Sequence, residues 1–134
     1  MKQALLIIED DPFISELLTK ELINSGFTVH YSADAEGGIE ILKTRIPDII
    51  LLDILLPGMN GFEFLEKIKA EERTKAIPVV ILSNLGSEDD IKKGKGLGAD
   101  AYLVKANFIM EDVVKKIEEV LQKKKTGHSK VEHA

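Results

Sequence analysis

Five side chains able to do chemistry stand at the ends of apolar runs that are typical of β-strands. Glu9 and Asp10 follow the first run, and Asp53 follows the third. Ser83 follows the fourth run and Lys105 the fifth. Three carboxylates brought together would repel one another, at on the order of 4 kcal/mol for each pair about 4 Å apart at an effective dielectric near 20. One lysine offsets only part of this, so oxygen ligands of this kind favour a hard divalent cation, Mg²⁺ in cells.

The alternation of apolar runs with amphipathic stretches predicts an α/β fold. Strands are predicted over residues 5–8, 27–31, 49–52, 79–82 and 101–104. Helices are predicted over residues 12–25, 34–45, 61–71 and 87–97, and in a last segment that starts near Asn107. The third strand is apolar at every position, which is typical of parallel strands covered on both faces. Five successive β–α units predict a flavodoxin-like, doubly wound, five-stranded parallel sheet of order 2-1-3-4-5, with helices on both faces.

This sheet would bring the five side chains to one edge. Ligands of open α/β sheets bind outside the carboxyl ends of the strands, and the first and third strands would be central neighbours. Taken singly, each residue has an ordinary structural explanation: an aspartate can cap a turn, Lys105 can be a surface charge, and Ser83 can bond to nearby backbone. Their joint placement on consecutive strand ends favours a site where a cation held by Asp10 and Asp53 binds phosphate.

Local signals mark the first and fourth helices. Asp11 is a good N-cap, and Pro12 suits the first helical position because its missing N–H costs nothing there. The inner face of this helix is expected to carry Ile14, Leu17, Leu18 and Leu22. Gly94, Gly96 and Gly98 lie in or at the end of the fourth helix, where each interior glycine costs about 0.5–1 kcal/mol relative to alanine. That helix is expected to be marginal, either because its surface rearranges or because it is simply short and poorly formed.

Composition and charge describe one globular domain with a basic end. The chain has 134 residues and no cysteine, which excludes a disulfide framework and thiolate metal sites. No apolar run could span a bilayer and no signal peptide is visible, so we expect a cytoplasmic protein. Of the net charge of −5, four Lys and one Glu from Gln122 onward contribute about +3, which leaves roughly −8 on residues 1–121. An acidic body argues against direct nucleic-acid binding. We predict a domain over residues 1–121 and a disordered, Lys-rich tail over residues 122–134.

At the level of motifs, the chain resembles the receiver domain of response regulators in two-component signalling systems, from about Leu5 to Leu121. Four segments carry the resemblance: LIIEDD at 6–11, DIILLDILLPGMNG at 48–61, PVVILS at 78–83 and GADAYLVK at 98–105. The second segment is the most specific of them. The resemblance implies a phosphoprotein that acts in signal transduction, as an interaction switch in a phosphorelay.

Residue by residue, the resemblance implies a magnesium site and a phosphoacceptor. Asp53 would form the aspartyl phosphate and would also bind Mg²⁺, with Asp10 and the backbone carbonyl of Leu55 as further ligands. Glu9 would bind the ion through water. Asp11 lies one residue past the acidic pair and could share that role, although the proline after it makes capping the better assignment.

The resemblance also implies a switch. Lys105 would pair with Asp53 and then with the phosphoryl oxygens, while Ser83 would turn its hydroxyl towards the phosphoryl group and Tyr102 would swing inward. The face that changes would comprise the fourth helix, the fifth strand and the fifth helix. Two departures stand out: Ser83 replaces the usual threonine, and Ala106 replaces the usual proline. A cis bond before Ala106 would cost about 2.5–4 kcal/mol, so the loop either sustains that strain or follows a trans path.

The implied partners are a histidine kinase or histidine phosphotransferase upstream and an unknown downstream protein, with no nucleic acid or membrane. The protein would be a monomer or weak dimer, either a stand-alone, chemotaxis-type receiver or a fragment of a larger regulator. We expect no enzymatic activity beyond slow self-phosphorylation and self-dephosphorylation. An aspartate-nucleophile phosphatase would need a second acid where Leu55 stands. A pseudo-receiver that only docks partners has generally lost acids that this chain keeps. His30, His128 and His133 show no ligand spacing.

Overall fold

The computed structural model describes residues 2–125, so His128, His133 and the predicted tail beyond residue 125 lie outside the described residues. Strands and helices alternate along this part of the chain. Their order is β1 (Ala4–Ile8), α1 (Pro12–Asn24), β2 (Thr28–Ser32), α2 (Ala35–Thr44), β3 (Ile49–Leu52), α3 (Gly61–Lys69), β4 (Val79–Ser83), α4 (Glu88–Gly96), β5 (Ala101–Val104), a 3₁₀ turn (Lys105–Asn107) and α5 (Met110–Lys125).

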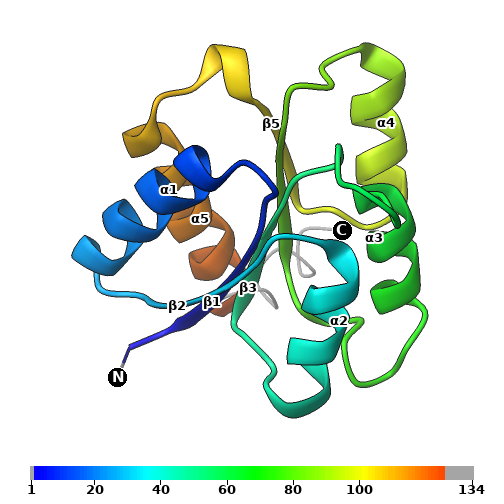
Figure 1. Ribbon diagram of the computed structural model, residues 1–134, viewed down its shortest axis with the longest axis horizontal. Helices are drawn as coiled ribbons and strands as arrows, with labels where there is room; N and C mark the ends of the chain where they lie inside the picture. The colour runs from blue at the N-terminus through cyan, green and yellow to red at the C-terminus, as the bar shows by residue number, and fades with distance from the viewer. Residues whose placement is uncertain (1, 126–134) are drawn as a thin grey trace.

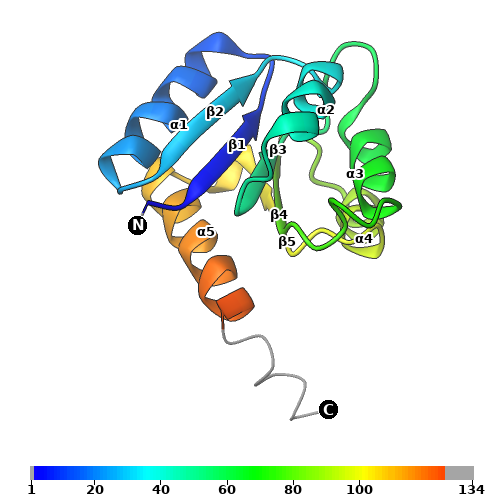
Figure 2. The same ribbon diagram turned by 90° about the horizontal axis from the view of Figure 1, so that it is seen from below.

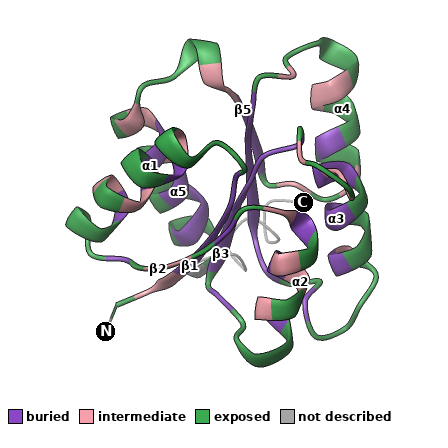
Figure 3. Cartoon of the chain, in the orientation of Figure 1, coloured by how far each residue is buried: buried purple, intermediate pink, exposed green. Residues whose placement is uncertain are grey.

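All five strands pair in parallel, in the order β2-β1-β3-β4-β5, which confirms the predicted fold class and strand order. Helices α1 and α5 cover one face of the sheet, and α2, α3 and α4 cover the other (Figures 1 and 2). The central strands are buried almost throughout, whereas the outer surfaces of the helices are exposed (Figure 3). None of the helices within residues 2–125 is both long and apolar enough to cross a membrane.

Two apolar cores, one on each face, hold the sheet in register. Successive side chains of a strand point to opposite faces. In β1, Leu5 and Ile7 therefore join the core under α1 and α5, while Leu6 and Ile8 join the core under α2, α3 and α4. All four side chains are fully buried. Burial of such a side chain stabilises the fold by about 1.5–3 kcal/mol, so the carboxyl end of β1 is firmly placed.

Helix α1 confirms the predicted start and corrects the predicted face. The Asp11 side chain accepts hydrogen bonds from the N–H groups of residues 13 and 14, as an N-cap should. Leu17, expected on the inner face, is 40% exposed, and Ser15 is buried instead. Ser15, Leu18 and Leu22 repeat at spacings of three and four residues. Leu17, one position before Leu18, is turned away by about 100°.

The connection from β5 to α5 also differs from the expectation. A helix starting near Asn107 was predicted, but residues 105–107 form a 3₁₀ turn and α5 begins at Met110. The carbonyl of Ile109 accepts the first helical hydrogen bonds, from the N–H groups of residues 112 and 113. No peptide bond in the described part of the chain is cis, so the loop after Lys105 takes the trans path. Helix α5 continues past residue 121, where we placed the domain end; those domain limits stay a prediction.

Two glycines of α4 provide a matched pair for a stability test. A Cβ on Gly94 would lie 2.8 Å from Ile81 Cδ1 and 2.8 Å from the ring of Tyr102, whereas a Cβ on Gly96 would meet nothing within 4 Å. We expect Gly94→Ala to destabilise the protein by about 1–3 kcal/mol through overpacking. Gly96→Ala should stabilise it by up to about 0.5–1 kcal/mol, since alanine is the better helix former. Urea unfolding would measure both, and equal stabilisation by the two changes would contradict the described packing.

Candidate functional site

The carboxyl ends of the strands carry a cluster of acidic side chains. Carboxylate oxygens of Glu9, Asp10 and Asp53 all lie within 4.8 Å of one another. Register explains the meeting, because β1 and β3 are adjacent and Ile8 pairs with Leu52, so the residues that follow both strands emerge side by side. Glu9 and Asp53 are buried, and Asp10 is exposed.

Lys105 bridges the two buried carboxylates. Its Nζ lies 2.8 Å from Glu9 Oε1 and 2.9 Å from Asp53 Oδ2, with only 12% of the lysine side chain exposed. Burial raises the pKa of the Glu9 carboxyl above its ordinary 4.5; the Lys105 hydrogen bond opposes this shift and the nearby Asp53 charge adds to it. Burial alone would lower the pKa of Lys105, but hydrogen bonds to Glu9 and Asp53 outweigh it and raise that pKa. Lys105 is therefore protonated, and Glu9 and Asp53 both bond to its ammonium group.

Asp53 is oriented by its own loop. Its Oδ1 accepts hydrogen bonds from the N–H groups of Ile54, at 2.7 Å, and Leu55, at 3.2 Å. Its backbone N–H donates to the carbonyl of Ile8 at 3.0 Å. Gly61 allows the start of α3 to approach this segment, because a Cβ there would lie 2.7 Å from the Cα of Ile54. One carboxylate oxygen thus faces backbone donors and the other faces the lysine.

The loop between β3 and α3 is held at several points. Asn60 and Glu63 form a capping box that fixes the start of α3. Glu36, in the first turn of α2, accepts a hydrogen bond from the N–H of Met59 at 3.0 Å. This loop carries Leu55, whose carbonyl was predicted as a metal ligand; that role stays a prediction. No spacing or periodicity predicts the Glu36 contact, because it joins residues far apart in the chain.

The turn after β1 is held by β2. The Glu9 N–H donates to the carbonyl of Ser32 at 3.1 Å, and the Tyr31 hydroxyl donates to the carbonyl of Glu9 at 2.9 Å. Glu9 Oε2 also accepts a hydrogen bond from the N–H of Asp11, at 3.1 Å. The Asp11 side chain caps α1, in agreement with the assignment preferred from the sequence. Tyr31 was missed, because its bond joins segments 22 residues apart in the chain and no spacing rule encodes it.

Ser83 and Tyr102 both bond to the backbone of Leu85, in the loop between β4 and α4. Ser83 is fully buried, and its Oγ accepts a hydrogen bond from the N–H of Leu85 at 3.3 Å. The hydroxyl of Tyr102 donates to the carbonyl of the same Leu85 at 2.7 Å. The Tyr102 side chain is already buried in this structure. The proposed turn of Ser83 towards a phosphoryl group and the movement of Tyr102 stay predictions, but the structure adds Leu85 as the residue that links them.

The ionisation of Tyr102 should leave a mark on stability. Burial raises the pKa of this phenol from 10.0 to about 12, with further contributions from the charges of Asp90 and Asp53. An unfolded chain would lose this proton near pH 10, so between pH 10 and 12 the unfolded state gains stability relative to the native state. We expect the melting temperature of the wild type to fall more steeply above pH 10 than that of Tyr102→Phe. The difference at neutral pH measures the lost hydrogen bond, and equal slopes would contradict the burial.

The donor set at this edge fits magnesium. All the side-chain ligands are carboxylate oxygens, which hard cations prefer, and few of them are available, as suits an ion that keeps several waters. Lys105 balances only one of the three negative charges. Asp10 is exposed and opens the cluster to solvent. Asp10 and Asp53 could bind the ion directly.

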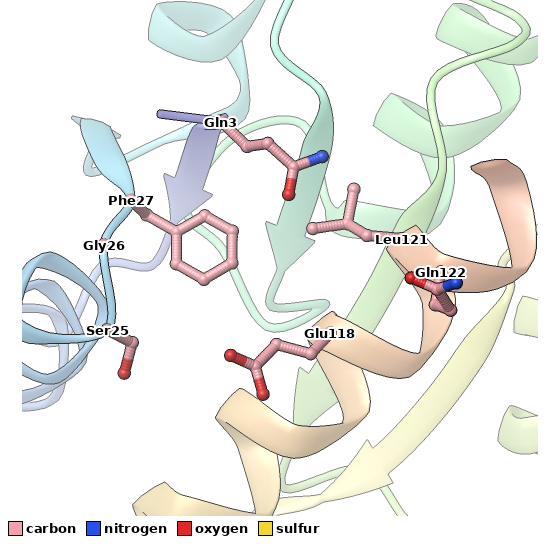
Figure 4. Close-up of a pocket in the computed structure, with 7 residues that line it drawn as sticks. All are labelled: Gln3, Ser25, Gly26, Phe27, Glu118, Leu121 and Gln122. Atoms are coloured by element: carbon pink, nitrogen blue, oxygen red, sulfur yellow. The ribbon is translucent and has the colours of Figure 1, made fainter. Parts of the chain in front are cut away.

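Two cavities differ in their relation to this cluster. A cavity of about 580 Å³ opens beside it and contains the following lining residues: Asp10, Ile54, Leu55, Leu56, Pro57, Asn60, Phe62 and Leu85. A second cavity, of about 240 Å³, lies at the amino ends of β1 and β2, between Phe27 and Glu118 (Figure 4). Of these two cavities, only the first includes one of the three acids, Asp10, in its lining, and its walls are mostly apolar.

Comparison with known proteins agrees with this geometry. The family model for the response regulator receiver domain matches residues 5–118. The DNA-binding dual master transcriptional regulator RpaA of Synechocystis is 36% identical over 119 residues, which cover 89% of this chain and 49% of RpaA. The phosphate regulon transcriptional regulatory protein PhoB of Escherichia coli is 35% identical over 123 residues, 92% of this chain and 53% of PhoB. The chain thus spans about half the length of these relatives.

Experimental structures give the same result for the fold. A CheY-like response regulator receiver domain protein from Methanospirillum hungatei has a TM-score of 0.87 at 27% identity, covering 95% of this chain and 99% of that one. The phosphorylated cyanobacterial phytochrome response regulator RcpA has a TM-score of 0.79 at 30% identity, covering 89% and 93%. Both similarities extend over nearly the whole described fold.

Proposed function

Since this chain belongs to the response regulator receiver domain family, we propose that Asp53 accepts a phosphoryl group and that the surface of α4, β5 and α5 changes in response. One observation carries the proposal: Asp53 is buried at a sheet edge with Glu9 and Asp10 within 4.8 Å and with the Lys105 ammonium at 2.9 Å. A carboxylate placed in this way has a nucleophilic oxygen, a cation for the incoming charge and oxygen ligands for a metal.

The proposed reaction transfers a phosphoryl group from a phosphohistidine of a histidine kinase or histidine phosphotransferase. An oxygen of Asp53 bonds to phosphorus, the P–N bond breaks, and the imidazole leaves with the bonding electron pair. Lys105, already bonded to Asp53, neutralises charge on the phosphoryl oxygens. A bound Mg²⁺ would supply further neutralisation and orient those oxygens.

For the metal we propose Asp10, Asp53 and the Leu55 carbonyl as direct ligands and Glu9 as a ligand through water. Both oxygens of Glu9 and both oxygens of Asp53 already accept bonds, from Lys105 and from backbone N–H groups, so an ion would share either of these buried carboxylates with them. The indirect role proposed for Glu9 therefore rests on the family resemblance. Asp10 is exposed beside the cavity and is open to an ion.

The readout would pass through Ser83, Leu85 and Tyr102 to a downstream protein. A bond from Ser83 to a phosphoryl oxygen contributes about 1.5–3 kcal/mol, typical of bonds to charged groups. That energy shifts a two-state equilibrium by roughly ten- to hundred-fold. RpaA and PhoB are transcriptional regulators, but this chain matches about half of each. For this chain we propose protein partners, a monomer or weak dimer, and a cytoplasmic location.

The test is phosphorylation by a small donor. We expect acetyl phosphate and Mg²⁺ to add one phosphoryl group, seen by intact mass, and we expect a chelator to suppress the adduct. Hydroxylamine should remove it, as it does other acyl phosphates. No adduct at any Mg²⁺ concentration, or an adduct that resists hydroxylamine, would contradict the proposal.

The alternatives are weaker on specific grounds. An aspartate-nucleophile phosphatase needs a general acid two residues after the nucleophile, and Leu55 stands there with a half-exposed hydrocarbon side chain. Rapid steady turnover of a generic phosphate ester would revive that reading. A docking-only pseudo-receiver would have no need of a buried lysine shared by two carboxylates. The geometry therefore favours a phosphorylated switch without true enzyme turnover.

A further inference from the structure

Tyr31 holds the backbone from which the acidic pair projects. It lies on β2, opposite Ile7 of β1, and its hydroxyl donates to the Glu9 carbonyl at 2.9 Å. The N–H of Glu9 donates to the Ser32 carbonyl at 3.1 Å. Both backbone polar groups of Glu9 are thus bonded to the end of β2. One of these two bonds is made by a side chain and can be removed alone.

Asp10 is the acid that depends most on this backbone. The side chains of Glu9 and Asp53 are each fixed by Lys105. Within the described residues, no side-chain hydrogen bond or ion pair fixes the exposed Asp10 carboxylate. Its position follows from its backbone dihedrals and from the peptide unit before it. That unit is planar and includes the Glu9 carbonyl, so the Tyr31 hydroxyl restrains the plane from which Asp10 projects.

We propose that Tyr31 is a positioning residue for the ion site, acting on Asp10 through the Glu9 carbonyl. This inference rests on the proposed function, since it assigns Asp10 to the ion. Partners that orient a metal ligand without touching the metal are worth about 10–100-fold in metal affinity. Tyr31 is 41% exposed, and water can replace part of its bond, so we expect an effect at or below the lower end of that range.

Tyr31→Phe removes the hydroxyl and keeps the ring. We expect the Kd for Mg²⁺, measured by calorimetry on the unphosphorylated protein, to rise about three- to tenfold, at or below the lower limit of the 10–100-fold effect of such partners. The Mg²⁺ concentration for half-maximal phosphorylation by acetyl phosphate should rise by the same factor. The rate at saturating Mg²⁺ should stay within about twofold of the wild type, because the Tyr31 hydroxyl bonds to the Glu9 carbonyl and not to Asp53, and Tyr31 does not line the cavity beside the acids.

Ser25→Ala is the matched control. The Ser25 hydroxyl also donates to a backbone carbonyl, that of Glu21 at 3.0 Å, but at the opposite end of the sheet. This variant should leave the Kd for Mg²⁺ unchanged. A purely structural role for Tyr31 predicts that both variants lose a little stability and that neither changes the Kd.

The outcomes separate the two claims. If the wild type binds Mg²⁺ and is phosphorylated while Tyr31→Phe has an unchanged Kd, the inference about Tyr31 is overturned and the proposed function stands. A loss of rate that persists at saturating Mg²⁺ would also overturn it. If the wild type neither binds Mg²⁺ nor accepts a phosphoryl group, the proposed function fails, and the inference fails with it.

Discussion

Asp53→Asn should reduce phosphoryl incorporation to below about one hundredth of the wild-type level, because removal of a nucleophile costs orders of magnitude in rate. The fold should persist, since the amide oxygen of asparagine can still accept the hydrogen bonds from Ile54 and Leu55. Without Mg²⁺ the variant should be at least as stable as the wild type, because one of three crowded negative charges is gone. Intact mass after incubation with acetyl phosphate measures the first effect, and thermal unfolding measures the second.

Asp89→Asn is the control for this change. Asp89 is exposed in the first turn of α4, and its substitution should leave the mass adduct intact. An undiminished adduct on Asp53→Asn would place the phosphoryl group elsewhere and would contradict the assignment of the acceptor. Loss of the adduct in both variants would indicate a defect unrelated to the site.

Lys105→Met should slow phosphorylation by about 10²–10³-fold, the typical effect of removing one preorganised group that stabilises developing charge. Its removal leaves Glu9 and Asp53 buried beside each other without a cation. Breaking a buried pair costs about 3–5 kcal/mol, and we expect the lower end because Glu9 can take up a proton. The stability deficit should shrink as the pH is lowered towards the ordinary pKa of glutamate, because protonation relieves the repulsion. Urea unfolding at several pH values checks this.

Lys69→Met offers a matched comparison. The Lys69 ammonium is partly buried and donates to the carbonyls of Lys75 and Ile77, at 3.0 and 2.7 Å, far from the acid cluster. This variant should lose stability but keep the wild-type phosphorylation rate. Equal rates in Lys105→Met and the wild type would remove the lysine from the proposed mechanism.

The sequence was sufficient for the architecture because each strand is a short apolar run and each connection is an amphipathic helix. The rule that ligands gather at the carboxyl ends of parallel strands then placed Glu9, Asp10, Asp53 and Lys105 together, as the structure does. The periodicity of apolar residues was less exact in predicting which side chains at the edge of a helix face are buried. It put Leu17 inside, although the buried positions of α1 run through Ser15 and Leu18.

Contacts that depend on tertiary structure could not be predicted from apolar runs or strand ends. The bonds from Tyr31 to the Glu9 carbonyl and from Met59 to Glu36 each join segments more than twenty residues apart, and no spacing rule encodes them. The path after Lys105 was left open because composition does not decide between cis and trans bonds before alanine when a fold can impose strain; the structure has the trans bond. The meeting of Ser83 and Tyr102 at Leu85 depends on how one loop folds back.

The sharing of Lys105 by two carboxylates has a consequence for how phosphorylation could be sensed at a distance. Three carboxylates and one ammonium carry two formal negative charges, which a divalent ion would cancel. Forming an acyl phosphate removes one negative charge from Asp53 and adds up to about two, so the total changes by roughly one unit. Through solvent at physiological ionic strength such a change is screened over about 8 Å, whereas charges inside the protein are screened much less. A remote surface separated from the site by solvent would therefore respond to contacts passed from atom to atom through the packed interior, while groups packed near Asp53 would also sense the new charge directly.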